Sequence, residues 1–452
     1  MFHTHTPLWL RVSSFFTLIA FVSYISTFTI QSTFASSIVY YIDATNGSDL
    51  ADGLTPATAW QTLTKANSAP LLSGDTLSFL CWESYSGSLS LLQSGIVWEP
   101  ITINSYGSCD GTNKPTLEGV TINNVSYITL DGLSVYASGS SAISVIGISP
   151  LQNIRVLNTN LSAPNSQCIL AENIDTIDIQ NNLFTNCQNG FSGSSIWGSL
   201  FQNTFSWITL NAVTLLGDSP VNILQNTLHH IGASGIIFAK WTSIVQNNLT
   251  NICTLWNSDC AAITNEKTNP ISTNFLSNIH ENIIKNVGSG ISGNNYGVDI
   301  RGIAWVDIVD NTIQNAEKAI YIEDSQNLNI YENINLLSRA TSLQTVQKTN
   351  DLVQGLTLTG NTFIQKNPDY SYFETRYDKA DTDGIQATIN GNTFYPLYKP
   401  NNNSYYRSIA YGGVTNDIWK NWRRQTWYGY SEMSKNFRRS NENAQTFNSW
   451  CE

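Results

Sequence analysis

Short apolar segments that end in an asparagine recur through the middle of the chain. In Ser243-Ile244-Val245-Gln246, for example, a few strand-forming residues lead directly to Asn247. An apolar residue stands two positions after the asparagine, as Phe205 does after Asn203. The recurring asparagines are Asn158, Asn181, Asn203, Asn226 and Asn247, and the series continues with insertions at Asn282, Asn311, Asn333, Asn361 and Asn392. The first five are 21 to 23 residues apart, which indicates a structural repeat.

A corner in the backbone explains the asparagine. This residue tolerates the left-handed conformation, and its amide can bond neighbouring backbone groups. A chain that coils must bend at the same place on each circuit, so we expect the asparagine side chains to stack and to bond from coil to coil. Each circuit then lays its strands beside those of the circuit before, which makes the sheets parallel. The pattern therefore predicts an all-β fold, a right-handed parallel β-helix (a solenoid) of roughly ten or more coils.

The two ends of the chain lack the clean repeat. We expect residues 36–130 to form an N-terminal cap and the first coils, and residues 131–395 to form the parallel β-helix. Residues 396–452 are rich in aromatic and basic side chains, among them Trp419, Trp422 and Trp427. A solenoid needs its open core covered at both ends. We therefore interpret the last segment as a C-terminal cap, with one helix around residues 416–424.

The first 35 residues have the features of an export signal. Arg11 belongs to a weakly positive start, and residues 15–30 are apolar but diluted by Ser and Thr. Thr33-Phe34-Ala35 then places small residues where a signal peptidase reads. The apolar stretch is short and polar for a membrane span, so a cleaved signal peptide over residues 1–35 is favoured over a retained anchor. We expect a secreted, periplasmic or cell-surface protein with no membrane association after cleavage.

Charge narrows the range of partners. The net charge is −11, and only 12% of the residues are charged. Nucleic acid rewards Lys and Arg, so we expect no nucleic-acid partner. An acidic chain also repels a polyanion over long range unless a local basic site or a metal intervenes. The partner that suits the long outer face of a solenoid is a polysaccharide, bound by a monomer.

Seven cysteines follow the predicted cleavage site: Cys81, Cys109, Cys168, Cys187, Cys253, Cys260 and Cys451. Export permits disulfides, and the odd number leaves at least one thiol free or paired with another chain. The two that close the shortest loop, Cys253 and Cys260, are the best candidates for a pair. Their spacing matches no zinc pattern, so a zinc site is not expected.

The N-terminal portion resembles that of many secreted bacterial β-helix proteins. The resemblance rests on Tyr41-Ile42-Asp43, on Ser73-Gly74-Asp75-Thr76-Leu77 and on Pro100-Ile101-Thr102-Ile103-Asn104. These proteins belong to the pectate-lyase-like superfamily, and the likeness covers nearly the whole chain after the signal. It implies the β-helix fold. It does not choose among lyases, hydrolases, epimerases and adhesins, and the sequence lacks the Asn-Thr-Asp, Gly-His-Gly and Asp-Pro-His-Glu signatures.

Alignment of strands in successive coils locates the candidate chemistry. Ile236 and Phe238 align with Ile263 and Asn265, then with Val298 and Ile300, then with Ile320 and Ile322. Alternation turns the intervening side chains outward. The outward positions then hold the candidate catalytic residues, which are Glu266, Asp299, Arg301, Tyr321 and Glu323. We expect these five residues on one outer face, within about 5–10 Å of one another.

Loops beside this face supply candidates for substrate binding. The steps from Asn247 to Asn282 and from Asn282 to Asn311 exceed the basic period, and long loops at one place often carry function. The candidate substrate-binding residues here and at the neighbouring turns are Lys240, Trp241, Trp256, Asp259 and Tyr296. The pair Cys253–Cys260 would brace one of these loops.

Three interpretations of the five residues remain open. In hydrolysis, two carboxylates act as acid and as base or nucleophile. In β-elimination from a uronate, Arg301 or bound Ca²⁺ neutralises the carboxylate, and Tyr321 or a lysine is the base. In the third, the residues are ordinary surface ion pairs on a sheet. No cofactor other than Ca²⁺ is expected, and the acidic residues Asp43, Asp49 and Asp52 are more typical of turns than of a Ca²⁺ site.

The sequence thus favours a carbohydrate-active enzyme, a glycoside hydrolase or a polysaccharide lyase, with a slight preference for hydrolysis or Ca²⁺-assisted lysis. The alternative is a cell-surface glycan-binding or adhesin-like protein that binds without turnover.

Overall fold

The structure is a computed structural model that describes residues 37–255, 259–266, 276–288, 294–347 and 355–365, with four further strands towards the C-terminus. The chain divides into two compact units, Met1–Ser37 and Ile38–Glu452, and nearly all described residues belong to the second. The predicted signal peptide, the predicted C-terminal helix and Asn392 lie outside the described residues.

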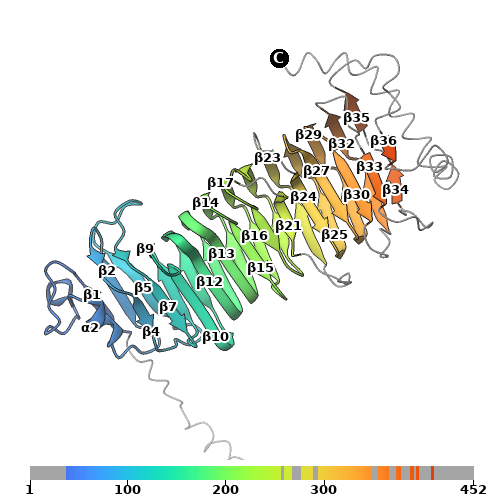
Figure 1. Ribbon diagram of the computed structural model, residues 1–452. Helices are drawn as coiled ribbons and strands as arrows, with labels where there is room; N and C mark the ends of the chain where they lie inside the picture. Colours follow the sequence, from blue (N-terminus) through green and yellow to red (C-terminus); the bar gives the residue numbers. More distant parts are fainter. Residues whose placement is uncertain are drawn as a thin grey trace, which may run out of the picture. The chain divides into compact units, whose positions relative to one another are not determined.

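Parallel strands stack in chain order into three columns, here called sheets 1, 2 and 3 (Figure 1). Sheet 1 holds β1 (Val39–Ile42), β2 (Thr76–Leu80), β5 (Ile101–Tyr106), β8 (Ile128–Asp131), β11 (Ile154–Leu157), β16 (Val221–Leu224), β19 (Ser243–Val245), β22 (Ser277–His280), β25 (Ala304–Val309), β28 (Gln326–Tyr331), β31 (Leu356–Thr359) and β34 (Ala387–Asn390). Sheet 2 holds β3 (Ser84–Tyr85), β6 (Thr116–Leu117), β9 (Ser134–Tyr136), β14 (Thr204–Ile208), β17 (Thr227–Ile231), β20 (Asn248–Ile252), β23 (Ile283–Val287), β26 (Thr312–Gln314), β29 (Ile334–Ser338), β32 (Thr362–Gln365) and β35 (Thr393–Pro396).

Sheet 3 completes each circuit. It holds β4 (Leu89–Leu91), β7 (Val120–Asn123), β10 (Ile143–Leu151), β15 (Val213–Leu216), β18 (Ile236–Phe238), β21 (Cys260–Asn265), β24 (Asn295–Arg301), β27 (Lys318–Glu323), β30 (Leu343–Gln347), β33 (Phe373–Tyr377) and β36 (Ile409–Tyr411). Two long strands, β12 (Asn160–Gln180) and β13 (Leu183–Phe201), pass through all three sheets. The predicted right-handed parallel β-helix is confirmed.

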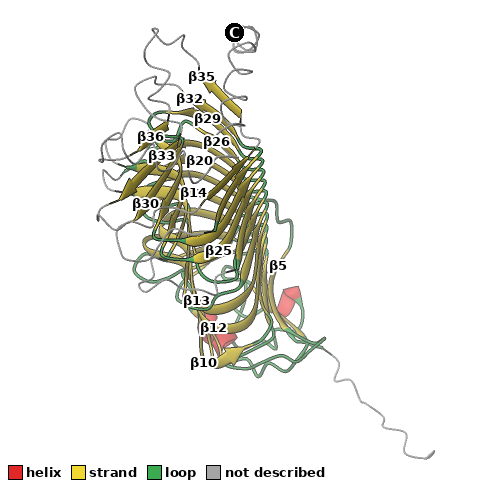
Figure 2. Ribbon diagram, turned by 90° about the vertical axis from the view of Figure 1, so that its right-hand side faces the viewer, coloured by secondary structure: helices red, strands yellow, loops and turns green. Residues whose placement is uncertain are grey.

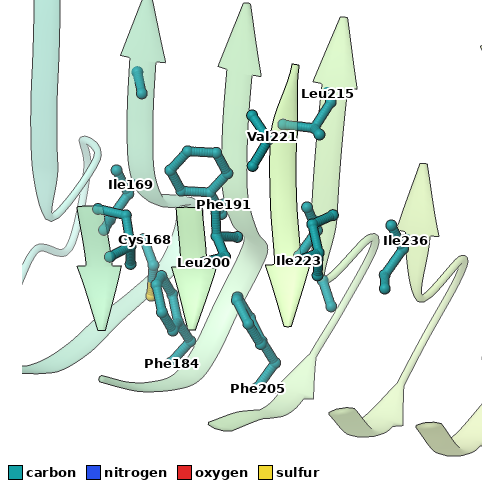
Figure 3. Close-up of a cluster of buried hydrophobic side chains, with 14 of the residues drawn as sticks. Cys168, Ile169, Phe184, Phe191, Leu200, Phe205, Leu215, Val221, Ile223 and Ile236 are labelled. Carbon is teal, nitrogen blue, oxygen red and sulfur yellow. The ribbon is translucent and has the colours of Figure 1, made fainter. Parts of the chain in front are cut away.

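Apolar side chains from all three sheets fill one continuous core. Most are isoleucine, leucine and valine with no exposed surface, and they repeat from coil to coil. Figure 3 shows part of this core, where the Phe184 and Phe205 rings stack with centroids 4.2 Å apart. Phe205 and Leu228, each two residues after a recurring asparagine, are fully buried as expected.

The asparagine ladder is present, with one correction to its geometry. Asn203, Asn226 and Asn247 are buried, and each backbone N–H and side-chain amide donates to the amide oxygen of the next asparagine at 2.8–3.0 Å. We expected the ladder asparagine to be the left-handed residue of the corner. The left-handed residue is instead the one before it, such as Gln246 with φ 56°.

The two earliest members of the predicted series therefore belong to another column. Asn158 and Asn181 have φ values of 49° and 56° and stand at the left-handed position. The ladder residue in the coil of Asn181 is Asn182, which donates to Asn203. The sequence did not reveal this shift of one residue, because the left-handed position and the ladder position are adjacent, and both hold asparagine at Asn181 and Asn182.

Among the residues that the structure describes, helices occur only in the first coils (Figure 2). The short η1 (Pro56–Thr58) and α2 (Leu63–Asn67) lie between β1 and β2. Asn67 of α2 donates to Ser88 O at 3.0 Å and accepts from Ser90 N at 2.8 Å, which ties the helix to β4. Leu63 and Ala66 of this helix are buried.

Three disulfides link described cysteines, namely Cys81–Cys109, Cys168–Cys187 and Cys253–Cys260. The pairing expected from the sequence, Cys253–Cys260, is among them. Cys168–Cys187 joins β12 to β13 and so links two consecutive coils. Cys451 lies outside the described residues.

Candidate functional site

Sheet 3 has the register that the sequence alignment predicted. Ile236 pairs with Ile263, Ile263 with Val298 and Val298 with Ile320. The outward positions therefore stack as well, because Asp299 pairs with Tyr321 and Arg301 with Glu323. The predicted alignment of these coils is confirmed.

Three of the candidate catalytic residues, Asp299, Tyr321 and Glu323, lie outside the main core and are nevertheless buried. Tyr296, Tyr321, Ala261 and Val346 form a small apolar cluster separate from the main core. Asp299 is 5% exposed and Glu323 is 1% exposed. The interpretation as ordinary surface ion pairs does not describe Asp299 and Glu323, since both carboxylates are withdrawn from solvent.

Arg301 is the centre of this buried cluster. Its Nε donates to both carboxylate oxygens of Asp299, at 2.8 and 2.9 Å, and Nη2 lies 2.7 Å from Oδ2. Glu323 lies 3.9 Å from Nη1 and Asp259 lies 3.8 Å from Nη2. One guanidinium thus faces three carboxylates, which gives the cluster an excess of negative charge.

Two tyrosine rings and a lysine enclose the ion pairs. The rings of Tyr296 and Tyr321 have centroids 4.7 Å apart. The Arg301 guanidinium lies 5.0 Å from the Tyr321 centroid, and Lys318 Nζ lies 5.1 Å from that of Tyr296. Cations over ring faces are attracted by the ring quadrupole. The Tyr321 hydroxyl donates to Glu323 Oε2 at 2.8 Å.

Burial sets the proton affinities of the cluster. It raises the pKa of the Asp299 carboxyl to about 6, although the bonds from Arg301 oppose the shift. Burial lowers the pKa of the Arg301 guanidinium, but its bonds to Asp299 outweigh that effect and raise it above the usual value. Burial and the bond to Glu323 raise the pKa of Tyr321, so its phenol keeps its proton.

Two of the residues predicted for the site, Glu266 and Lys240, lie apart from the Arg301 cluster. Glu266 is exposed and accepts a hydrogen bond from Gly217 N at 3.3 Å. Lys240 pairs with Asp218 at 3.0 Å. Both residues stand at the turn that follows sheet 3, and the structure does not bring either into contact with Arg301.

Of the other candidate substrate-binding residues, two belong to the Arg301 cluster and two do not. Asp259 reaches the cluster, and its Oδ1 also accepts from Asn294 Nδ2 at 2.9 Å. Tyr296 is buried within the cluster. Trp241 is 42% exposed at the corner after β18. Trp256 lies outside the described residues.

Sequence reasoning missed two residues of the site. Lys318 aligns with Tyr296 across β24 and β27. The next two residues, Ala319 and Ile320, are both in the core, so simple alternation assigns Lys318 to the wrong side. Asn265 takes an inward position and exchanges two 2.8 Å hydrogen bonds with the Arg301 backbone. The alignment of Asn265 with the apolar residue Phe238 could have indicated this inward position from the sequence.

The acidic residues Asp43 and Asp49 near the N-terminus accept hydrogen bonds from backbone N–H groups. Asp43 accepts from Thr45 N and Asn46 N, and Asp49 accepts from Gln61 N and Thr62 N, at 2.8–3.0 Å. Within the described part of the chain, no three His, Cys, Asp or Glu side chains are grouped to hold a metal ion. None of the helices described there is long and apolar enough to cross a membrane.

Several solved structures are similar in fold at low identity. A mutant of a periplasmic alginate epimerase is 11% identical, with a TM-score of 0.46, over 72% of this chain and 77% of that chain. A family 6 polysaccharide lyase specific for mannuronic acid, from human gut microbiota, is 12% identical, with a TM-score of 0.40, over 79% and 90%. A GH136 lacto-N-biosidase from Eubacterium ramulus is 13% identical, with a TM-score of 0.39, over 78% and 67%.

At these identities and TM-scores, none of the three transfers an activity to this chain. No protein-family model matches the sequence, and no curated protein matches it.

Proposed function

We propose that this chain is an exported carbohydrate-active protein that hydrolyses a polysaccharide at the outer face of sheet 3. The observation that carries the proposal is the pair of buried carboxylates, Asp299 and Glu323, on either side of the Arg301 guanidinium. Two carboxyl groups held in different environments are the requirement for glycoside hydrolysis. Asp299, with its pKa raised to about 6 by burial, serves as the general acid, and Glu323 serves as the second carboxylate.

Hydrolysis fits this arrangement better than elimination does. A lyase needs a free cation to neutralise the uronate carboxylate, but Arg301 is already held by both oxygens of Asp299. Tyr321 is a poor base, because burial raises its pKa and its proton is donated to Glu323.

Burial itself favours a second candidate function. Asp299 is 5% exposed and Glu323 is 1% exposed, and a role in holding adjacent coils together would need no access to either carboxylate. The chain would then bind a glycan without turning it over.

A polysaccharide panel tests the proposal. We expect new reducing ends without the ultraviolet absorbance of unsaturated uronates, with or without Ca²⁺. Asp299→Asn and Glu323→Gln should each lower the rate about 100-fold or more, the usual contribution of a positioned acid or base. Asp307→Asn is the matched control, because Asp307 lies in β25, the next strand of the chain, and accepts an exposed bond from Asn329. Full activity in both site variants would show that the proposed residues are wrong.

The rate should also depend on pH in one direction. A general acid works when protonated, and half of the Asp299 carboxyls are protonated near pH 6. The value of kcat/KM should therefore fall about tenfold per pH unit above pH ~6. The residual rate of Asp299→Asn should lack this decline. A wild-type profile that rises through pH 6 would instead make Asp299 a base.

A further inference from the structure

A line of apolar side chains, four of them exposed, follows the corner between sheets 3 and 1. The register puts Trp197, Pro220, Trp241, Leu276 and Trp305 at the same corner position in five consecutive coils. The three tryptophans are 57%, 42% and 50% exposed, and Leu276 is 60% exposed. We call Trp197, Trp241 and Trp305, with the two residues between them, the tryptophan ridge.

Backbone geometry makes tryptophan a costly choice at this corner. Trp241 and Trp305 have φ values of 58° and 66°, in the left-handed region that bulky side chains avoid. Asn153 and Asn327 occupy the same corner in other coils, with φ values of 52° and 51°. Asparagine suits that conformation. Trp241 and Trp305 accept this strain and expose apolar surface in one line with Trp197, and this alignment points to a function outside the fold. Trp207 also has a left-handed φ, but its ring stacks on that of His230 with centroids 4.3 Å apart.

Spacing indicates the kind of ligand. Successive coils are about 4.8 Å apart, so neighbouring tryptophans of the ridge, two coils apart, are separated by about 10 Å. The ridge is about 20 Å long and one side chain wide. A stable contact between two protein chains needs a broad patch, about 800 Å² on each partner. A narrow line of flat rings suits an extended chain of repeating units.

Along the chain the ridge residues follow the strands of sheet 3. Trp305 is four residues after Arg301, and Trp241 is three residues after the end of β18. We propose that the tryptophan ridge binds a linear polysaccharide parallel to the stacking direction of the coils, with every second sugar unit lying on a tryptophan. The C–H face of a pyranose ring packs on the aromatic face. This inference rests on the proposed function for the class of ligand and adds where the polymer lies.

Asparagine substitutions test the ridge without disturbing the corner. We expect Trp241→Asn and Trp305→Asn each to weaken retention about five- to tenfold in affinity gels containing alginate, polygalacturonate, arabinoxylan or β-glucan, whichever retains the wild type. Trp207→Asn is the matched control. Trp207 is 59% exposed with φ 56°, but it belongs to a different corner, where Asn186 and Asn251 hold the same position. It should change retention less than twofold.

The outcomes separate this inference from the proposed function. If a polysaccharide is hydrolysed but the KM for the polymer is the same in Trp241→Asn, Trp305→Asn and the wild type, the ridge inference is wrong and the function stands. If nothing is hydrolysed but the ridge variants lose retention, the function is wrong and the ridge stands. Failure of all four polysaccharides to retain the wild type overturns the ridge. So does a dimer, seen by light scattering, that only the ridge variants dissociate.

Discussion

Replacing Asn247 with leucine is expected to lower the free energy of unfolding by about 3–5 kcal/mol. The Asn247 amide donates to Ile223 O at 2.8 Å and to Asn282 Oδ1 at 3.0 Å, and its oxygen accepts from Asn226 N at 2.8 Å. Leucine has a similar size but satisfies none of these buried groups, so several donors and acceptors lose their partners at once. Urea unfolding followed by tryptophan fluorescence measures the loss.

An exposed amide ladder beside the buried one provides the control. Gln225 donates to Gln246 Oε1 at 3.0 Å and accepts from Gln202 at 3.1 Å, on the surface of the same coils. Its φ of 55° is kept readily by asparagine. Gln225→Asn should cost less than about 0.5 kcal/mol, as surface substitutions do. Equal losses in Asn247→Leu and Gln225→Asn would refute a special role for the buried ladder.

Replacing Arg301 with methionine is expected to cost about 3–5 kcal/mol, the usual effect of removing one partner from a buried ion pair. Asp299 and Glu323 would then stay buried without the guanidinium that lies between them. Arg155→Met is the control, because the Arg155–Asp178 pair is 3.4 Å long and its side chains are 41% and 29% exposed. The control should lose less than about 1 kcal/mol.

The cost of Arg301→Met should depend on pH. Burial already holds the pKa of Asp299 at about 6, above its ordinary value, against the pull of Arg301. A raised carboxyl pKa means that the folded state binds the extra proton, so the contribution to stability is present at low pH and is lost as pH rises through 6. Without Arg301 the pKa rises further. The variant should therefore lose more stability at pH 8 than at pH 5, and a constant loss across that range would contradict this account.

Much of the fold could be predicted because the repeat is local. The positions of Ile236, Ile263, Val298 and Ile320 depend only on counting residues between corners, and each pairs as expected. The one-residue error at Asn158 and Asn181 arose where the left-handed position and the ladder position both hold polar residues that suit a turn. Only the hydrogen bonds distinguish the two columns.

The site was predicted less fully, for two physical reasons. Alternation fails where two consecutive residues, Ala319 and Ile320, both enter the core, so Lys318 was missed. The backbone is close there, since a side chain at Gly297 would meet Ala319 O. Burial depends on which loops cover a face, and loop paths follow no period. The sequence therefore placed Asp299 and Glu323 on the outer face correctly but carried no sign that they would be enclosed.

The disulfide between Cys168 and Cys187 has a mechanical consequence. A solenoid whose units touch only their neighbours comes apart unit by unit when its ends are pulled. A crosslink between two consecutive coils removes that freedom for the pair that it joins. The 19 residues from one cysteine to the other would then be withheld from the stretched chain, which shortens its final extension by about 65 Å. Reduction of the bond would release that length in a single-molecule pulling trace.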